Sequence, residues 1–401
     1  MSELYELPDG WEWKTLDQVS KILGGGTPKR NINEYWKNGH IVWLSPTDLG
    51  KIGDVDEISN SKDKITQLGL EKSSAKLLPI GTVLFSSRAT IGKIAINTIE
   101  VSTNQGFANF VCNSDLLNKY LAYCLSRFTE AITSLSNSTT FKEVSKSSLK
   151  EFKIPLPPLP EQQRIVSKLD LLFEKIDKSI ALHQKNMDEA NAFMGSVLND
   201  IFGELEEKYE KKQLHTVIKI IGGGTPSKSE KTYWDNGNIK WATVGDMNVE
   251  TIVDTELSIT EIGLKNSSSN IIPKEAIIIA TRVGLGKVCY LNFDTAINQD
   301  LKGLLPLNDK LDIRFLFNYF KNIKEYIISN GTGATVKGVK LDFIKELEIP
   351  LPALPIQQKV VTYLDEISQK IEKIKQLQKE KMASLKALKA SILDSAFRGE
   401  L

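Results

Sequence analysis

Residues 154–163 read IPLPPLPEQQ, and residues 349–358 read IPLPALPIQQ. Closely spaced prolines cannot continue a helix, so each stretch predicts a stiff, extended connector. Pro160 and Pro355 suit the first turn of a following helix, where the missing N–H of proline costs nothing. The chain therefore passes from connector to helix twice, at positions 195 residues apart.

Apolar residues follow each connector mainly at three- and four-residue steps, which is typical of a coiled coil. The pattern predicts two helices of about 40 residues, each about 60 Å long at about 1.5 Å per residue. A narrow apolar stripe needs one partner, so we expect the two helices to pair antiparallel; independent surface helices on each domain are the alternative. The stripes are Leu169, Leu172, Ile176, Ile180, Met187, Ala190, Met194, Val197 and Ile201, and Val360, Leu364, Ile367, Ile371, Ile374, Met382, Leu385, Leu388 and Ile392.

The duplication extends outward from the connectors over most of the chain. Residues 24–49 (GGGTPKRNINEYWKNGHIVWLSPTDL) match residues 222–247 (GGGTPSKSEKTYWDNGNIKWATVGDM) without a gap. A repeat of nearly 200 residues is far too long for a solenoid, so it indicates a duplicated domain with its connector. Further matches join 86–96 to 280–290, 104–105 to 298–299, and 138–163 to 333–358.

Each half begins with short β-rich runs and one helical stretch, separated by Gly, Pro and Asn. We therefore expect an α+β fold, with two globular domains separated by a pair of long antiparallel coiled-coil-like helices. The expected domains are residues 1–157 and 211–355, each followed by a helical segment, residues 158–210 and 356–401.

The composition is that of a soluble, folded protein: 401 residues, 51 Lys and Arg against 50 Asp and Glu, and 41% hydrophobic residues. The acidic excess lies in residues 158–210, with 11 acidic and 6 basic side chains, which leaves the rest slightly basic and permits DNA binding. Three scattered cysteines, charges near the start and no long apolar run predict a cytoplasmic protein without disulfides or a membrane segment.

Signatures of catalysis are missing from the sequence. GGGTP lacks the Lys-Ser/Thr pair by which a phosphate-binding loop reaches nucleotide and Mg²⁺. Asp9, Glu12 and Lys14 spell a nuclease triad only superficially, because metal-binding carboxylates come from separate rigid elements. We expect no catalytic residue, no metal site and no cofactor in this chain.

Two arginines are the strongest DNA-contact candidates. Arg88 and Arg282 each end an apolar strand-like run and open a turn that ends in Lys93 or Lys287. Arginine reads guanine through two hydrogen bonds, whereas lysine contacts phosphate. An internal salt bridge is the alternative for either arginine.

Other candidates share a polar or basic side chain in a turn. The GGGTP amides and the Thr hydroxyl can approach a phosphate, although the turn can equally serve only to reverse the chain. Glutamine can pair with adenine, or be a buried anchor. The polar runs 136–142 and 331–337 end in lysine and can contact DNA or remain solvated. These candidates are Thr27, Lys29, Arg30, Gln105, Lys142, Thr225, Lys228, Gln299 and Lys337.

The duplicated GGGTP…YW…NG block, the Arg…Gly-Lys turns and the IPLPxLPxQQ connectors resemble the specificity subunits of type I restriction–modification enzymes over essentially the whole chain. Ile356, where the first copy has Glu161, is a modest departure. The resemblance implies a non-catalytic subunit whose two domains each read half of a split DNA target. A protein scaffold that assembles partners without reading DNA is the alternative.

The resemblance also implies partners. The helices would dock two methyltransferase (modification) subunits, which would bind S-adenosylmethionine and methylate adenine, and restriction or translocase subunits can join. We expect the partner-binding surface to include the glutamines at the two helix starts, Gln162, Gln163, Gln357 and Gln358.

Overall fold

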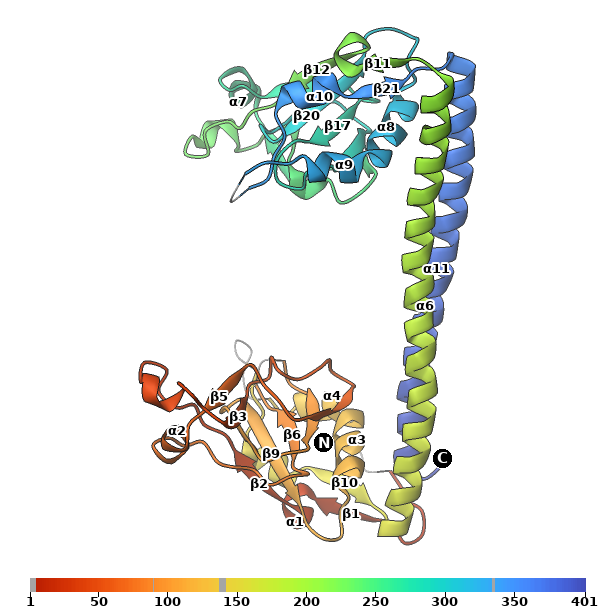
Figure 1. The fold of residues 1–401 in the computed structure, drawn as a ribbon. Helices are drawn as coiled ribbons and strands as arrows, with labels where there is room; N and C mark the ends of the chain where they lie inside the picture. The colour runs from red at the N-terminus through yellow and green to blue at the C-terminus, as the bar shows by residue number, and fades with distance from the viewer. Residues whose placement is uncertain (1–4, 89, 137–141, 334–335) are drawn as a thin grey trace. The chain divides into compact units, whose positions relative to one another are not determined.

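The computed structural model describes residues 5–88, 90–136, 142–333 and 336–401. The chain forms two compact units, the first made of residues 1–183 and 380–401, the second of residues 184–379 (Figure 1). Two long helices contribute to both units: α6 (Leu159–Lys208) and α11 (Leu354–Arg398). Among the described residues, no helix has the length and apolar character needed to cross a membrane.

The first unit is built on a five-stranded sheet of order β2-β9-β6-β7-β4, a three-stranded sheet β5-β3-β8, and the pair β1-β10. The elements before α6 are β1 (Glu12–Thr15), α1 (Leu16–Val19), β2 (Ser20–Gly24), η1 (Asn33–Tyr35), β3 (Ile41–Leu44), β4 (Val55–Ile58), β5 (Asp63–Ile65), α2 (Gln67–Glu71), β6 (Val83–Ser86), β7 (Ile94–Asn97), β8 (Val101–Thr103), β9 (Phe107–Cys112), α3 (Asn118–Arg127), α4 (Thr129–Thr133), α5 (Lys146–Glu151) and β10 (Lys153–Leu156).

Strand β6 shows why this sequence forms a central strand. Its side chains alternate between two apolar clusters: Val83 and Phe85 pack with helix α3, whereas Leu84 faces the cluster of β3 and β8. The middle of helix α3, residues 120–125, is buried and shares its cluster with Ile165 and Leu169 of α6. The helix therefore joins the sheet to α6 within this unit.

The second unit repeats this plan, with sheets β12-β20-β17-β18-β14 and β15-β13-β19-β16 and the pair β11-β21. Its other elements are β11 (Lys211–Gln213), η2 (Leu214–Thr216), β12 (Ile218–Gly222), η3 (Lys231–Tyr233), β13 (Ile239–Ala242), η4 (Val244–Asp246), β14 (Thr251–Ile252), β15 (Leu257–Ile259), α7 (Glu261–Lys265), β16 (Asn270–Ile272), β17 (Ile277–Ala280), β18 (Val288–Leu291), β19 (Thr295–Ile297), β20 (Leu301–Pro306), α8 (Ile313–Asn322), α9 (Lys324–Ser329), α10 (Leu341–Glu346) and β21 (Glu348–Pro350).

The two long helices pack together inside each unit. In the first unit, Arg164 donates to the Leu401 carbonyl and Lys389 pairs with Asp177, so α6 and α11 run antiparallel there. In the second unit, Phe202 of α6 and Leu364 of α11 share one buried cluster. The predicted fold, two domains that combine helices and strands together with a packed pair of long helices, is confirmed, and independent surface helices are excluded.

The connectors and helices differ in detail from the prediction. The proline segments are extended, as predicted, and β10 and β21 pair antiparallel with β1 and β11 through them. The helices contain 50 and 45 residues, more than the predicted 40 or so. The stripes taken from the sequence end at Ile201 and Ile392, whereas the helices continue through buried Leu205 and Phe397.

Candidate nucleic-acid interface

Three chain segments meet where strands β2, β6 and β8 end, and together they form one loop edge of the first unit. The GGGTP segment lies along the end of β8, where Gly26 N donates to the Thr103 carbonyl over 2.8 Å. The end of β6 lies beside the turn after β8, since Ser87 N donates to the Gly106 carbonyl over 2.8 Å. These bonds bring residues 24–27, 87–88 and 104–106 together.

A fourth segment, residues 142–144, joins them although it is distant in sequence. Val144 N donates to the Ser87 carbonyl over 2.9 Å, and Glu143 forms a β-bridge with Arg88. Lys142 is exposed beside this bridge, whereas residues 137–141 of the same polar run lie outside the described part of the chain.

The second unit assembles the equivalent four segments. Gly224 N donates to the Ile297 carbonyl, and Thr281 N donates to the Asp300 carbonyl, both over 2.9 Å. Val339 N in turn donates to the Thr281 carbonyl over 2.9 Å. Residues 334–335 are not described, but exposed Lys337 follows them. The fold thus gathers Thr225, Arg282, Gln299 and Lys337 at one edge.

The glutamines stand at the tips of these edges. Asn104 and Asn298 use their side-chain oxygens to accept the backbone N–H two residues on, which closes each turn. The asparagines are therefore turn formers. Gln105 and Gln299 are exposed, and each accepts a hydrogen bond from the threonine of its GGGTP segment.

Both arginines form an ion pair and remain accessible. Arg88 Nε lies 2.7 Å from Glu143, and Arg282 lies 3.6 Å from Asp300. Their side chains are 45% and 56% exposed, a setting in which an ion pair contributes about 0–1 kcal/mol. A pair this weak can exchange for contacts with DNA, so both interpretations made from sequence are compatible with the geometry.

The two turn lysines are tied to neighbouring loops. Lys93 Nζ donates to the carbonyls of Pro46 and Leu49, each over 3.0 Å. Lys287 Nζ donates to the side chain of Asn248 over 2.7 Å. In this arrangement both lysines fix a loop, and their charges lie next to the arginine turns.

The basic side chains after GGGTP differ in how firmly neighbouring residues hold them. Arg30 lies 3.8 Å from the ring centre of Trp36 and donates to Asp63 over 2.6 Å. Lys29 and Lys228 are exposed in the turns that follow GGGTP, although Lys29 is matched by Ser227 and Arg30 by Lys228 in the repeat. These two lysines are better placed for phosphate than Arg30.

The glutamines at the two helix starts divide into two kinds. Gln162 is fully buried; its amide accepts from Leu117 N and donates to the Asp115 and Pro157 carbonyls, all over 2.9 Å. Gln357 is equally buried and makes the equivalent three bonds. The expectation that these two residues contact a partner needs correction, because their amides are turned inward and clamp helix to domain. Gln163 and Gln358 are exposed.

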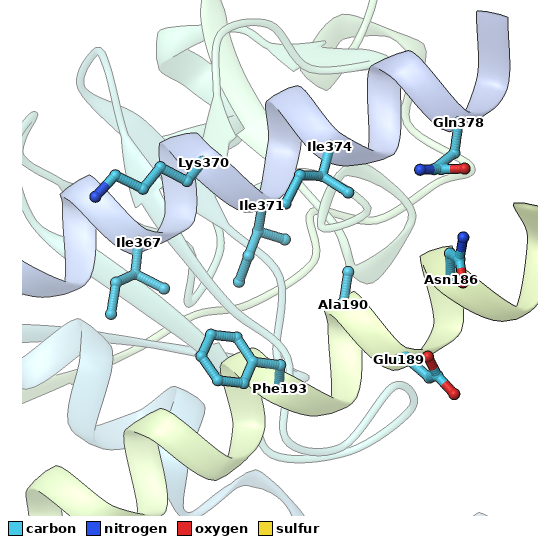
Figure 2. Close-up of a pocket in the computed structure, with 9 residues that line it drawn as sticks. All are labelled: Asn186, Glu189, Ala190, Phe193, Ile367, Lys370, Ile371, Ile374 and Gln378. Atoms are coloured by element: carbon cyan, nitrogen blue, oxygen red, sulfur yellow. The ribbon is translucent and has the colours of Figure 1, made fainter. Parts of the chain in front are cut away.

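Within the second unit, α6 and α11 leave an open apolar groove of about 650 Å³ (Figure 2). Phe193 of α6 points toward Ile367 and Ile371 of α11, and the small side chain of Ala190 leaves the space between the helices open. The first unit has Leu385 at the position equivalent to Ala190, 195 residues on.

The described residues offer no ionised thiol and no metal centre. Burial raises the pKa of Cys112 and Cys289 to about 12 each, so these thiols stay protonated at neutral pH. No group of three or more His, Cys, Asp or Glu in the described ranges could hold a metal ion.

Sequence reasoning missed two lysines at these edges. Lys146 extends over Gly24, where a side chain on the glycine would collide with it. Lys302 is half buried, which lowers its pKa, and it donates to the Gln299 carbonyl over 2.8 Å. For Lys302, the only indication in the sequence was a lysine within the apolar run of β20. For Lys146 there was no indication in the sequence.

Comparisons with known proteins match most of the chain. The family model described as "Type I restriction modification DNA specificity domain" matches residues 8–190 and again 206–381. The type I restriction enzyme MjaIX specificity subunit of Methanocaldococcus jannaschii is 28% identical, over 100% of this chain and 95% of the relative. The Escherichia coli EcoR124I/EcoR124II specificity subunit is 32% identical over 44% of this chain and 46% of the relative.

Two solved structures are similar along the whole chain. One, from work on complex assembly and conformational transition of the type I R-M system, is 25% identical with a TM-score of 0.78, and covers 99% of this chain and 100% of its own. The HsdS subunit from Thermoanaerobacter tengcongensis has the same fold at 24% identity and a TM-score of 0.55, with coverage of 100% and 99%.

Proposed function

Since the chain belongs to the type I restriction–modification DNA specificity family, whose members are non-catalytic within their complex, we propose how it divides the recognition of DNA. Residues 1–157 read one half of a split target, and residues 211–355 read the other. The observation that carries this proposal is the recurrence, in each unit, of an exposed arginine and an exposed glutamine on one loop edge.

The target is asymmetric, because the two edges differ chemically. The segments between the matched blocks, residues 50–64 and 248–258, differ in length and in sequence. In double-stranded DNA, Arg88 and Arg282 read base edges, while Lys29, Lys228, Lys142 and Lys337 neutralise phosphate. Arg30, Lys93 and Lys287 add positive charge near each edge while they hold loops in place.

The helical segments, residues 158–210 and 356–401, dock two methyltransferase subunits. The duplication presents a similar surface twice, with Gln163 and Gln358 exposed at the helix starts. The methyltransferases bring S-adenosylmethionine and methylate adenine, restriction or translocase subunits can join the assembly, and the complex acts in the cytoplasm.

The test is to express the chain with its methyltransferase and to map methylated adenines in the host DNA. We expect a single bipartite, asymmetric target, and native mass spectrometry should give two methyltransferase copies per chain. A helical scaffold that does not read DNA would leave methylation without any dependence on this chain's sequence, and that result would refute the proposal.

A further inference from the structure

The GGGTP threonine and a distant glutamine form the same hydrogen bond in both units. Thr27 Oγ1 donates to Gln105 Oε1 over 2.5 Å, and Thr225 Oγ1 donates to Gln299 Oε1. The partners are 78 and 74 residues apart in sequence, so the tertiary fold alone brings them together. Because this hydrogen bond recurs in both units, it belongs to the common structure of the loop edge.

Close backbone packing fixes the threonine in place. A Cβ on Gly25 would lie 2.1 Å from the Asn104 carbonyl, and one on Gly223 would lie 2.2 Å from the Asn298 carbonyl, so only glycine allows this approach. The proline that follows each threonine is buried. The hydroxyl is therefore held by a rigid segment, whereas the glutamine it meets is exposed.

In the second unit, the carboxylate of Asp300 fixes the orientation of the Gln299 amide. Gln299 Nε2 lies 3.4 Å from a carboxylate oxygen of Asp300, and a carboxylate at neutral pH only accepts hydrogen bonds. The NH₂ group must therefore face Asp300, which leaves Oε1 facing the hydroxyl of Thr225. The remaining N–H and the second lone pair of Oε1 stay available on the exposed side.

We propose that Thr27 and Thr225 are positioning residues, which hold the amides of Gln105 and Gln299 so that each reads the edge of one base in its half-site. This inference rests on the proposed function and deepens it. A long side chain that is oriented before binding loses less freedom when DNA arrives, so support from a neighbouring group sharpens base selection. The threonines then act through the glutamines, and not on phosphate.

The test compares four variants of the methyltransferase-bound chain: Thr27→Val, Thr27→Ser, Gln105→Ala and the double variant Thr27→Val/Gln105→Ala. Binding is measured to the mapped target and to duplexes with each single base-pair substitution. Gln105→Ala should reduce discrimination about 10-fold at one position of one half-site. Thr27→Val should weaken discrimination at that same position by about 3-fold, and Thr27→Ser should preserve it.

The double variant is the decisive comparison, because the effects of two substitutions do not add when one residue acts through the other. It should discriminate no worse than Gln105→Ala alone. Thr98→Val is the matched control, since the hydroxyl of exposed Thr98 donates only to the Ile58 carbonyl in the described structure, and it should leave discrimination unchanged.

Three results would overturn the inference: an equal loss of affinity for every duplex with Thr27→Val, an effect at a different base from Gln105→Ala, or no effect of Gln105→Ala. Thermal unfolding of Thr27→Val and Thr27→Ser checks that both fold. If the wild-type complex itself shows no split target, the proposed function has failed and this inference fails with it. If the target is present but Thr27 and Gln105 are uncoupled, the inference alone is wrong.

Discussion

Arg88 and Arg282 occupy equivalent places in the two units but are paired through different loops. Arg88 meets Glu143, which lies on the segment before α5, whereas Arg282 meets Asp300 in the turn before β20. Each acid is replaced by glycine in the other unit: Gly106 stands where the second unit has Asp300, and Gly338 stands where the first has Glu143. The backbone frame is duplicated, but the charges placed on it are not.

The same contrast recurs at the GGGTP segment. In the first unit, Asp63 opposite Trp43 in the sheet binds Arg30. In the second unit, Leu257 lies opposite Trp241 at that position, and the arginine is replaced by Lys228. The units thus keep the contacts that shape the edge and vary those that face outward, which is the distribution expected of two half-sites that differ.

The largest effect should come from the clamps that the units share. Gln162→Ala or Gln357→Ala removes three hydrogen bonds to the backbone, one of them to a buried proline carbonyl, and a buried group left without a partner costs about 1–3 kcal/mol. We expect a loss of about 3 kcal/mol or more in the unit that carries the change. Urea unfolding followed by hydrogen exchange resolves which unit is affected.

The neighbouring glutamines supply the control for this comparison. Gln163 and Gln358 are exposed, so Gln163→Ala and Gln358→Ala should change stability by less than about 0.5 kcal/mol. An equally small change for Gln162→Ala would show that the clamp does not hold the helix to the domain.

Substitutions of Arg88 and Arg282 test the difference in charge pairing between the two units. Arg88→Ala should relax one half-site by about 1–3 kcal/mol and leave the other intact, and Arg282→Ala should do the reverse. Glu143→Gln and Asp300→Asn keep the shape but remove the charge that each arginine pairs with. They should strengthen DNA binding slightly, since the guanidinium no longer has to leave a carboxylate.

Mapping methylated adenines for each variant measures this effect. If Arg88→Ala left the choice of site unchanged while it lowered thermal stability, Arg88 would be a structural arginine, and the Glu143 pair would be its function.

Most of the architecture could be predicted from the sequence, because it depends on repetition and periodicity. The matched blocks predicted two like domains, and the spacing of residues such as Leu169 and Leu364 predicted the paired helices. These signals are local and are read directly from one chain. Burial of the central strands likewise followed from apolar runs such as residues 277–280.

The roles of single side chains could not be predicted in the same way. Gln162 and Gln163 are adjacent and chemically identical, and only the helix phase makes one a buried clamp and the other a surface group. The partners of Lys93 lie 47 and 44 residues away. Such contacts depend on how loops meet in three dimensions, which no spacing in the sequence encodes.

The groove between the helices gives a smaller effect. Ala190→Leu adds apolar volume where the second unit is open and the first unit already has Leu385. We expect the second unit to gain about 1 kcal/mol in the isolated chain, because the added side chain packs beside Phe193 and Ile371. Thermal unfolding measures the gain, and an exposed substitution, Ser196→Leu, should give none. A loss of stability with Ala190→Leu would mean that the helices are already too close to admit the larger side chain.

The exposed lysines after GGGTP should have the smallest effect and the one most alike in the two units. Lys29 and Lys228 are exposed at neighbouring positions of the same turn, and a lysine that contacts a phosphate releases about one counterion. Lys29→Ala or Lys228→Ala should therefore weaken binding of all sequences alike and reduce the slope of log K against log salt by about 1. Lys310→Ala, an exposed lysine near the Gln357 clamp, should leave the slope unchanged. A change confined to one half-site would instead mean that the lysine reads a base, and the one-residue shift between Lys29 and Lys228 would then be a further difference between the two edges.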